Sequence, residues 1–132
     1  MKEKLEKNEY LEVYIDRDKN RCYMTLRGYW ESQQTVPTFR DIMLKYPKLL
    51  KPNFTTLLDM REFRVPAPDV MDMFVEVMKE NSKYEYKKSA RIVNGPLEKL
   101  ATQRVGKESQ TIEKTVLFNT IEEAEAWLDE DD

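Results

Sequence analysis

Hydrophobic and polar side chains alternate with a period of two in two short runs that follow the first nine residues. The apolar members of these runs are Leu11, Val13, Ile15, Cys22, Met24 and Leu26. Such alternation is typical of strands with one buried face, and the polar residues 18–20 between the runs favour a turn. The pattern therefore predicts a β-hairpin that ends at Gly28, with its strands at one side of a sheet.

A longer apolar run from Phe54 to Met60 predicts a strand of a different kind. Its apolar residues are nearly continuous, which is typical of a strand covered on both faces in the middle of a parallel sheet. Residues 89–94 and 115–118 predict two further strands. Ligands and partners usually meet an open α/β sheet at the carboxyl ends of its strands, so the loop from Asp59 to Pro68 is the first place to look for function.

Four segments carry apolar residues at steps of three and four, the spacing of helices that pack against a sheet. The first is expected to begin at Ser32 or Thr35, with Pro37 favouring the later start, and to be ended by Pro47 and Pro52. The second is expected to run from about Asp69 to Ser82, with Asp69 as its N-terminal cap.

The third helix is expected to follow Pro96 and to end at Gly106, a typical C-terminal cap. The apolar residues that this helix is expected to carry are Leu97, Leu100, Ala101 and Val105. Thr120 and Glu123 have the spacing of a capping box for a final helix. The order β-β-α-β-α-β-α-β-α predicts an α/β domain with a mixed, mostly parallel five-stranded sheet and right-handed crossovers.

Composition limits the classes of function. A chain of 132 residues fits one domain, which is expected at residues 10–129 between a flexible N-terminal arm, residues 1–9, and an acidic tail, residues 130–132. Histidine is absent, and Cys22 is the single cysteine. The chain therefore lacks the commonest general base and transition-metal ligand and forms no internal disulfide. We expect a cytoplasmic protein with no membrane span, no cofactor and no metal site, in which Cys22 is a small core side chain.

The charge pattern does not favour nucleic-acid binding. The net charge is −3, and basic residues are scattered among acids rather than gathered into one patch, apart from the lysine-rich residues 79–91. Asp59 is a possible catalytic carboxylate, but no second acid or base stands at a defined spacing from it, and such residues more often cap a turn. The chain is therefore not expected to be an enzyme.

The second predicted helix has an unusually wide apolar face. Its polar side chains occupy a sector of about 100°, whereas its apolar side chains spread over about 200°. Either a neighbouring helix covers part of this face, or the face contacts a second subunit, a partner or an apolar ligand. Arg61 and Arg64 before it either bind an acidic partner or stay solvated. The predicted interaction surface consists of Asp59, Arg61, Phe63, Arg64, Val70, Met71, Phe74, Val75 and Met78.

Five segments, taken with the order of elements, resemble the STAS-type domains and in particular the SpoIIAA-like family, which is related in fold to bacterial anti-sigma-factor antagonists. These segments are Gly28 to Trp30, Leu57 to Met60, Ala90 to Val93, Val116 to Phe118 and Glu123 to Leu128. The resemblance implies a non-enzymatic interaction or sensing module that contacts partners around the start of the second helix. In the antagonists a phosphorylated serine lies at that start. Here no hydroxyl side chain occurs from Arg61 to Asp72, so the phosphorylation switch is not carried over.

Two functions are therefore expected. The first is a regulatory or protein-interaction module without catalysis, whose contacts include a possible homodimer through the second helix. The second is the binding or sensing of a small apolar ligand between the second helix, the third helix and the sheet. An enzyme ranks third, because the sequence shows no constellation of acids and nucleophiles.

Overall fold

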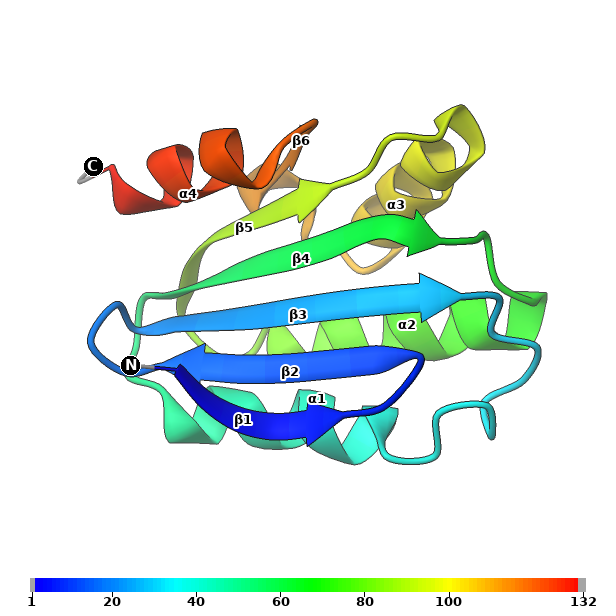
Figure 1. The fold of residues 1–132 in the computed structure, drawn as a ribbon, viewed down its shortest axis with the longest axis horizontal. Helices are drawn as coiled ribbons and strands as arrows, with labels where there is room; N and C mark the ends of the chain where they lie inside the picture. The colour runs from blue at the N-terminus through cyan, green and yellow to red at the C-terminus, as the bar shows by residue number, and fades with distance from the viewer. Residues whose placement is uncertain (1, 131–132) are drawn as a thin grey trace.

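A computed structural model describes residues 2–130 and contains, within them, a six-stranded sheet and four α-helices (Figure 1). The strands are β1 (Lys2–Lys7), β2 (Leu11–Asp16), β3 (Arg21–Gly28), β4 (Phe54–Phe63), β5 (Tyr86–Ile92) and β6 (Thr115–Phe118). The helices are α1 (Phe39–Leu49), α2 (Pro68–Asn81), α3 (Pro96–Glu108) and α4 (Ile121–Asp129), with a 3-10 turn η1 (Ile112–Lys114) before β6.

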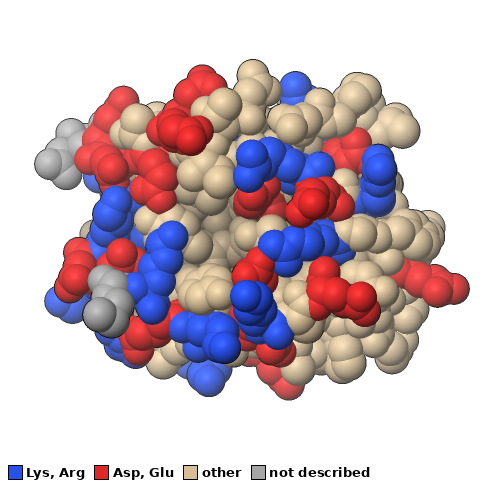
Figure 2. Space-filling model, in the orientation of Figure 1, with Lys and Arg blue, Asp and Glu red and all other residues tan. Residues whose placement is uncertain are grey.

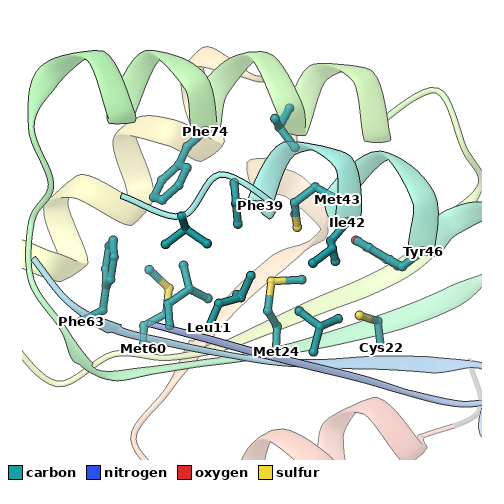
Figure 3. Close-up of a cluster of buried hydrophobic side chains, with 14 of the residues drawn as sticks. Leu11, Cys22, Met24, Phe39, Ile42, Met43, Tyr46, Met60, Phe63 and Phe74 are labelled. Carbon is teal, nitrogen blue, oxygen red and sulfur yellow. The ribbon is translucent and has the colours of Figure 1, made fainter. Parts of the chain in front are cut away.

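The strands follow one another across the sheet in chain order. β1, β2 and β3 pair antiparallel, and β3 to β6 pair parallel, which confirms the predicted hairpin and mixed sheet. Right-handed crossovers that always advance in one direction place their helices on the same face of a sheet, so α1, α2 and α3 share one face. α4 packs on the opposite face against β4 and β5, as Figure 3 shows with the pale red helix below the sheet.

The sheet has six strands and not the expected five, because part of the predicted flexible arm forms β1. Residues 2–7 pair with β2, and Leu5 packs against the main core. The Lys2 ammonium also lies 3.9 Å from the centroid of the Tyr23 ring. Alternating lysines and glutamates give a strand no hydrophobic pattern, yet they suit an exposed edge, where charge discourages pairing with other chains. The residues of β1 therefore form a strand because they pair with β2, and not because of a pattern in their own sequence.

The end of the hairpin is tied to the helices by Trp30, which is fully buried. Its ring packs edge-on against Phe39, Phe63 and Phe74, with centroids 5.1, 5.6 and 5.5 Å away. Its indole N–H donates to the Arg27 carbonyl at 2.9 Å. Aromatic pairs in this geometry add to the energy of burial. The cluster therefore holds the start of α1 and the N-terminal half of α2 against the ends of β3 and β4.

Two helix boundaries differ from the expected ones at prolines and acids. α1 begins at Phe39, later than expected, and ends at Leu49, between the two prolines predicted to end it, with the buried Pro47 inside its last turn. At the start of α2 the capping position is Ala67, and Asp69 lies exposed in the first turn. Asp69 is therefore not the N-terminal cap, although its negative charge suits that end of the helix dipole.

The ends of α3 and α4 show one wrong and one confirmed prediction. α3 runs past Gly106, and the left-handed residue after it is Gln110. Gly106 is instead a contact point, since a Cβ there would lie 3.3 Å from the Cβ of Ile112. Thr120 is confirmed as the N-terminal cap of α4, because its hydroxyl oxygen accepts the backbone N–H of Glu123 at 3.2 Å, while the Glu123 carboxylate accepts the Thr120 hydroxyl at 3.0 Å.

Candidate functional site

Asp59, the landmark of the predicted site, is paired within its own strand. The Arg61 guanidinium donates to both of its carboxylate oxygens, at 2.7 and 2.9 Å, and the Arg61 backbone N–H donates at 3.2 Å. Burial by itself raises the pKa of the Asp59 carboxyl, but the hydrogen bonds and charge of Arg61 outweigh burial and hold this pKa below its usual value. Asp59 is therefore an ionised, locally satisfied carboxylate.

The predicted interaction surface does not form one continuous patch. Arg61 and Arg64 are exposed, and Asp59, Val75 and Met78 are half-buried. The remaining members, Phe63, Val70, Met71 and Phe74, are buried in the interior. This corrects their assignment to an outer surface: α2 is covered by the sheet, by α1 and by α3, so its wide apolar face is explained by burial beneath neighbouring helices. Val70 and Phe74 are thus core residues.

Four of the predicted residues meet at a cavity instead. Phe63, Met71, Phe74 and Met78 line a space of about 40 Å³ between α2, α3 and the sheet. The wall is predominantly apolar, and its sheet and α1 residues include Met24, Met43, Met60 and Phe39. Figure 3 shows Met24, Met60 and Phe63 rising from the sheet towards Phe39, Met43 and Phe74 on the helix side.

A β-bulge explains how β4 supplies several side chains to this cavity. Between the pairs Thr25 with Asp59 and Arg27 with Glu62, β4 has one residue more than β3. An extra residue shifts the alternation of a strand, so side chains an odd number of positions apart reach the same face. Met60 and Phe63 both reach the helix side and line the cavity for this reason. Sequence patterns do not reveal such a bulge.

The cavity also contains polar groups that the sequence did not single out. Arg91 of β5 and Thr102 of α3 line it, and both side chains are buried. The Arg91 Nε and the Thr102 hydroxyl have no hydrogen-bond partner, and the Arg91 Nη2 lies 3.8 Å from the Met78 sulfur. Burial lowers the pKa of the Arg91 guanidinium. The electrostatic influence of Tyr86 and Tyr46 raises this pKa but is smaller than the effect of burial. Within residues 89–94, the segment that the sequence predicts as a strand, Arg91 is the single charged residue, a signal that could have been noticed.

A smaller cavity adjoins the first at Met78, which lines both. Its volume is about 20 Å³, and Asn81 at the end of α2 forms part of its wall. Both polar atoms of the buried Asn81 amide lack a hydrogen-bond partner. Native structures leave few buried polar groups unpaired, so three such side chains around two adjoining cavities mark an unusual region of this core.

α3 forms the outer wall of the main cavity. Ala101, Thr102 and Val105 face the cavity, whereas Leu97 and Leu100, which belong to the predicted apolar stripe, are 67% and 63% exposed. The helix is rotated relative to the expected stripe because it packs on α2 and η1 rather than squarely on the sheet. α3 therefore has a narrow buried face and is the least firmly embedded of the crossover helices.

Other candidate sites have local explanations. Cys22 is fully buried, and burial raises the pKa of its thiol, so it is an unreactive core residue. On the face shown in Figure 2, Lys and Arg side chains lie interspersed with Asp and Glu, and Arg27 bonds both Glu12 and Glu62. Among residues 2–130 there is no group of three potential metal ligands, and no helix is long and apolar enough to cross a membrane.

Comparisons with known proteins identify the fold of the chain and no function. No family model and no curated protein matches the chain. A crystal structure of an uncharacterised protein of the DUF3478 family from Shewanella loihica PV-4, described as having a SpoIIAA-like fold, is similar to 94% of this chain and 98% of its own, with a TM-score of 0.58 and 18% sequence identity. The chain has a SpoIIAA-like fold. The predicted resemblance to STAS-type domains is thereby confirmed at the level of the fold.

In this SpoIIAA-like domain, the start of α2 offers no hydroxyl side chain. Residues 61–72, which span the end of β4 and the first turn of α2, contain no serine, threonine or tyrosine. α2 begins at Pro68 without a side-chain cap. The feature of this domain that stands out is therefore the cavity behind α2 and not a group at its start.

Proposed function

We propose that this SpoIIAA-like domain is a non-catalytic regulatory module that binds a small apolar ligand between α2, α3 and the sheet. The observation that carries the proposal is the apolar cavity itself, because protein interiors are normally packed without such spaces. Five of the seven methionines of the chain line it: Met24, Met43, Met60, Met71 and Met78. Methionine is flexible and polarisable, which suits a wall that adapts to a ligand.

The size of the cavity indicates how a ligand would enter. Its volume of about 40 Å³ is well below the roughly 150 Å³ of an engineered cavity that binds benzene. A ligand with a ring or a chain therefore requires the wall to move outward. α3 is the element that supplies this movement, since its exposed Leu97 and Leu100 are not held by packing. Ligand binding thus couples to the position of α3, which gives the domain a way to signal.

Binding, rather than catalysis, is supported by the groups that face the cavity. Arg91, Thr102 and Glu98 are its polar lining residues. The Thr102 hydroxyl has no hydrogen-bond partner, whereas an activated nucleophile needs a base within reach. Asp59 lies elsewhere and is held by Arg61. We therefore assign no catalytic step to this site.

A neutral apolar probe and a cavity-filling variant test the proposal. Titration with 1-octanol should shift the methyl resonances of the five lining methionines, while Met73, which is buried outside the cavity, serves as the internal reference. Ala101→Trp places a large ring into the cavity and should abolish these shifts. Leu100→Trp, on the exposed side of the same helix, should leave them intact. Absence of any selective shift in the wild-type protein would refute the proposal.

Contact with a protein partner is a second candidate, favoured by the two leucines exposed on α3. Leu97 and Leu100 lie one turn apart and present apolar surface to solvent. With the apolar face of α2 buried, α3 replaces α2 as the candidate for a homodimer contact. Sedimentation velocity across a concentration series should then show an association that Leu97→Lys with Leu100→Lys removes. A wild-type protein that stays monomeric throughout would count against this candidate.

A further inference from the structure

We propose that the ligand of the cavity is a small apolar carboxylic acid whose carboxylate binds Arg91 and the Thr102 hydroxyl. This inference rests on the proposed function and names the chemical class of the ligand. It follows from the unpaired charge of Arg91, from the polar groups beside it and from the apolar remainder of the wall.

Arg91 is a buried cation without a counter-ion. Its side chain is 3% exposed, and among residues 2–130 no carboxylate pairs with it. Its Nη2 lies 3.8 Å from the Met78 sulfur, which is a weak acceptor. A guanidinium stays protonated in proteins, and a buried charge is costly unless it is paired. The site therefore lacks a negative group.

Arg21 provides a comparison within the same molecule. It is also 3% exposed, but it lies on the α4 side of the sheet, where each of its three nitrogens is bonded. Nε donates to the Thr55 hydroxyl at 2.8 Å, and the two terminal nitrogens pair with Glu125 and Asp129. The fold thus satisfies one buried guanidinium fully and leaves the other open towards a cavity.

The neighbours of Arg91 fit a carboxylate. Thr102 lines the same cavity from α3 with an unpaired hydroxyl, so a carboxylate between them would accept hydrogen bonds from both residues. A guanidinium matches the two oxygens of a planar carboxylate particularly well, and a carboxylate is smaller than a phosphate. The rest of the wall is methionine, aromatic and aliphatic, which suits an apolar body.

Glu98 is the competing partner within the chain. It also lines the cavity from the first turn of α3, and its side chain lies over Gly95, where a Cβ would come within 1.8 Å of its carboxylate oxygen. If a movement of α3 brought Glu98 to Arg91, the chain would supply its own anion. With an external acid, Glu98 instead repels the ligand. The two possibilities predict opposite effects of Glu98→Gln.

The test compares octanoate with 1-octanol, which have similar apolar bodies and differ in charge, using the methionine methyl resonances at neutral pH. Wild-type protein should bind octanoate about ten-fold or more tightly than octanol, as expected for a charge-assisted hydrogen bond in a buried site. Arg91→Met should remove this preference and still bind octanol. Thr102→Val, which keeps the shape of the side chain, should weaken octanoate binding alone. Glu98→Gln should strengthen it.

Each contrary outcome has one meaning. Equal affinities for octanoate and octanol in the wild-type protein would overturn the assignment of Arg91 and leave the apolar cavity intact. No binding of either probe would refute the proposed function and this inference with it. A Glu98→Gln variant that is less stable and binds octanoate no better would identify Glu98 as the partner of Arg91. Circular dichroism of Arg91→Met and of Arg91→Lys establishes that the variants are folded.

Discussion

Asp59 and Arg91 lie on neighbouring strands, and their surroundings assign them different roles. Asp59 has the position that draws attention in an α/β sequence, yet Arg61 binds both of its oxygens. Arg91 lies one strand away, in register with Leu58, and its Nε has no partner. A buried charged residue without a partner indicates a site more strongly than a paired one, because burying an unpaired charge costs free energy whereas paired charges are common in proteins.

The pairing of Asp59 with Arg61 predicts a dependence of stability on pH. Because the pKa of Asp59 is lowered in the folded protein, its contribution is complete above the ordinary aspartate pKa of roughly 3.9 and is lost as the pH falls through the lower folded value. Asp59→Asn should therefore cost about 1 kcal/mol of unfolding free energy at neutral pH. The difference from wild type should shrink below about pH 4, as measured by urea denaturation across this range.

Asp69→Asn is the matched control for that measurement. Asp69 is an exposed acid in the first turn of α2. Its replacement removes an acid from an exposed position and so separates the loss of a carboxylate from the loss of the contact with Arg61. A difference between Asp59→Asn and wild type that stayed constant from neutral to acidic pH would contradict the assigned role of the carboxylate.

At the scale of elements, α2 and α3 show how two crossover helices on one face of a sheet acquire different duties. α2 is buried on three sides and carries the core through Val70, Phe74 and Val77. α3 buries Thr102, Val105 and Gly106 and exposes leucines. A helix with a narrow buried face depends less on packing, so it can move without disrupting the core.

The N-terminal cap of α4, Thr120, is expected to contribute to the free energy of unfolding. Thr120→Ala removes the hydroxyl that accepts the Glu123 backbone N–H, and an unsatisfied helix start should lower the unfolding free energy by about 1 kcal/mol. Thr38→Ala is the matched control, because Thr38 occupies the capping position of α1 but its hydroxyl donates to Glu6 instead. Equal losses for the two variants in urea denaturation would show that the Thr120 bond does not stabilise α4.

At the scale of the whole molecule, helices cover one face of the sheet over most of its width, and α4 covers part of the other. The main cluster lies between the sheet and the crossover helices, and a small second cluster lies beneath α4. Figure 1 shows α3 at the end of the row of helices, beside the ends of β4 and β5. The cavity thus lies between α2, which is buried on three sides, and α3, the outermost helix of the layer.

This arrangement predicts a gradient of protection in hydrogen exchange. Backbone amides of α3 should exchange faster than those of α2, because local opening is easier where few side chains are buried. Octanoate should slow exchange in α3 and leave α4, on the opposite face, unchanged. Mass spectrometry of peptic fragments measures both effects. An α3 as strongly protected as α2 in the free protein would contradict its role as the movable wall.

The sequence was sufficient for the elements whose signal is local. Periodicity and residues within a few positions of each other predict these elements. They are the hairpin, the central strand, the order of the strands and helices that follow it, and the N-terminal cap of α4. β1 was not predicted, because it forms a strand through its pairing with β2 and its own composition shows no strand pattern. The exposure of Leu97 and Leu100 could not be predicted, because helical spacing identifies an apolar stripe but not which part of it the neighbouring elements cover.

What the sequence determined by itself is therefore the SpoIIAA-like order of elements and the missing hydroxyls at the start of α2. The tertiary structure decided the candidate site, because the cavity exists only where β4, β5, α2 and α3 meet. Arg91 and Thr102 come from different elements, and whether a buried cation has a partner depends on contacts that lie far apart along the chain. Local patterns record which residues can be buried, whereas packing determines which of them are left unpaired.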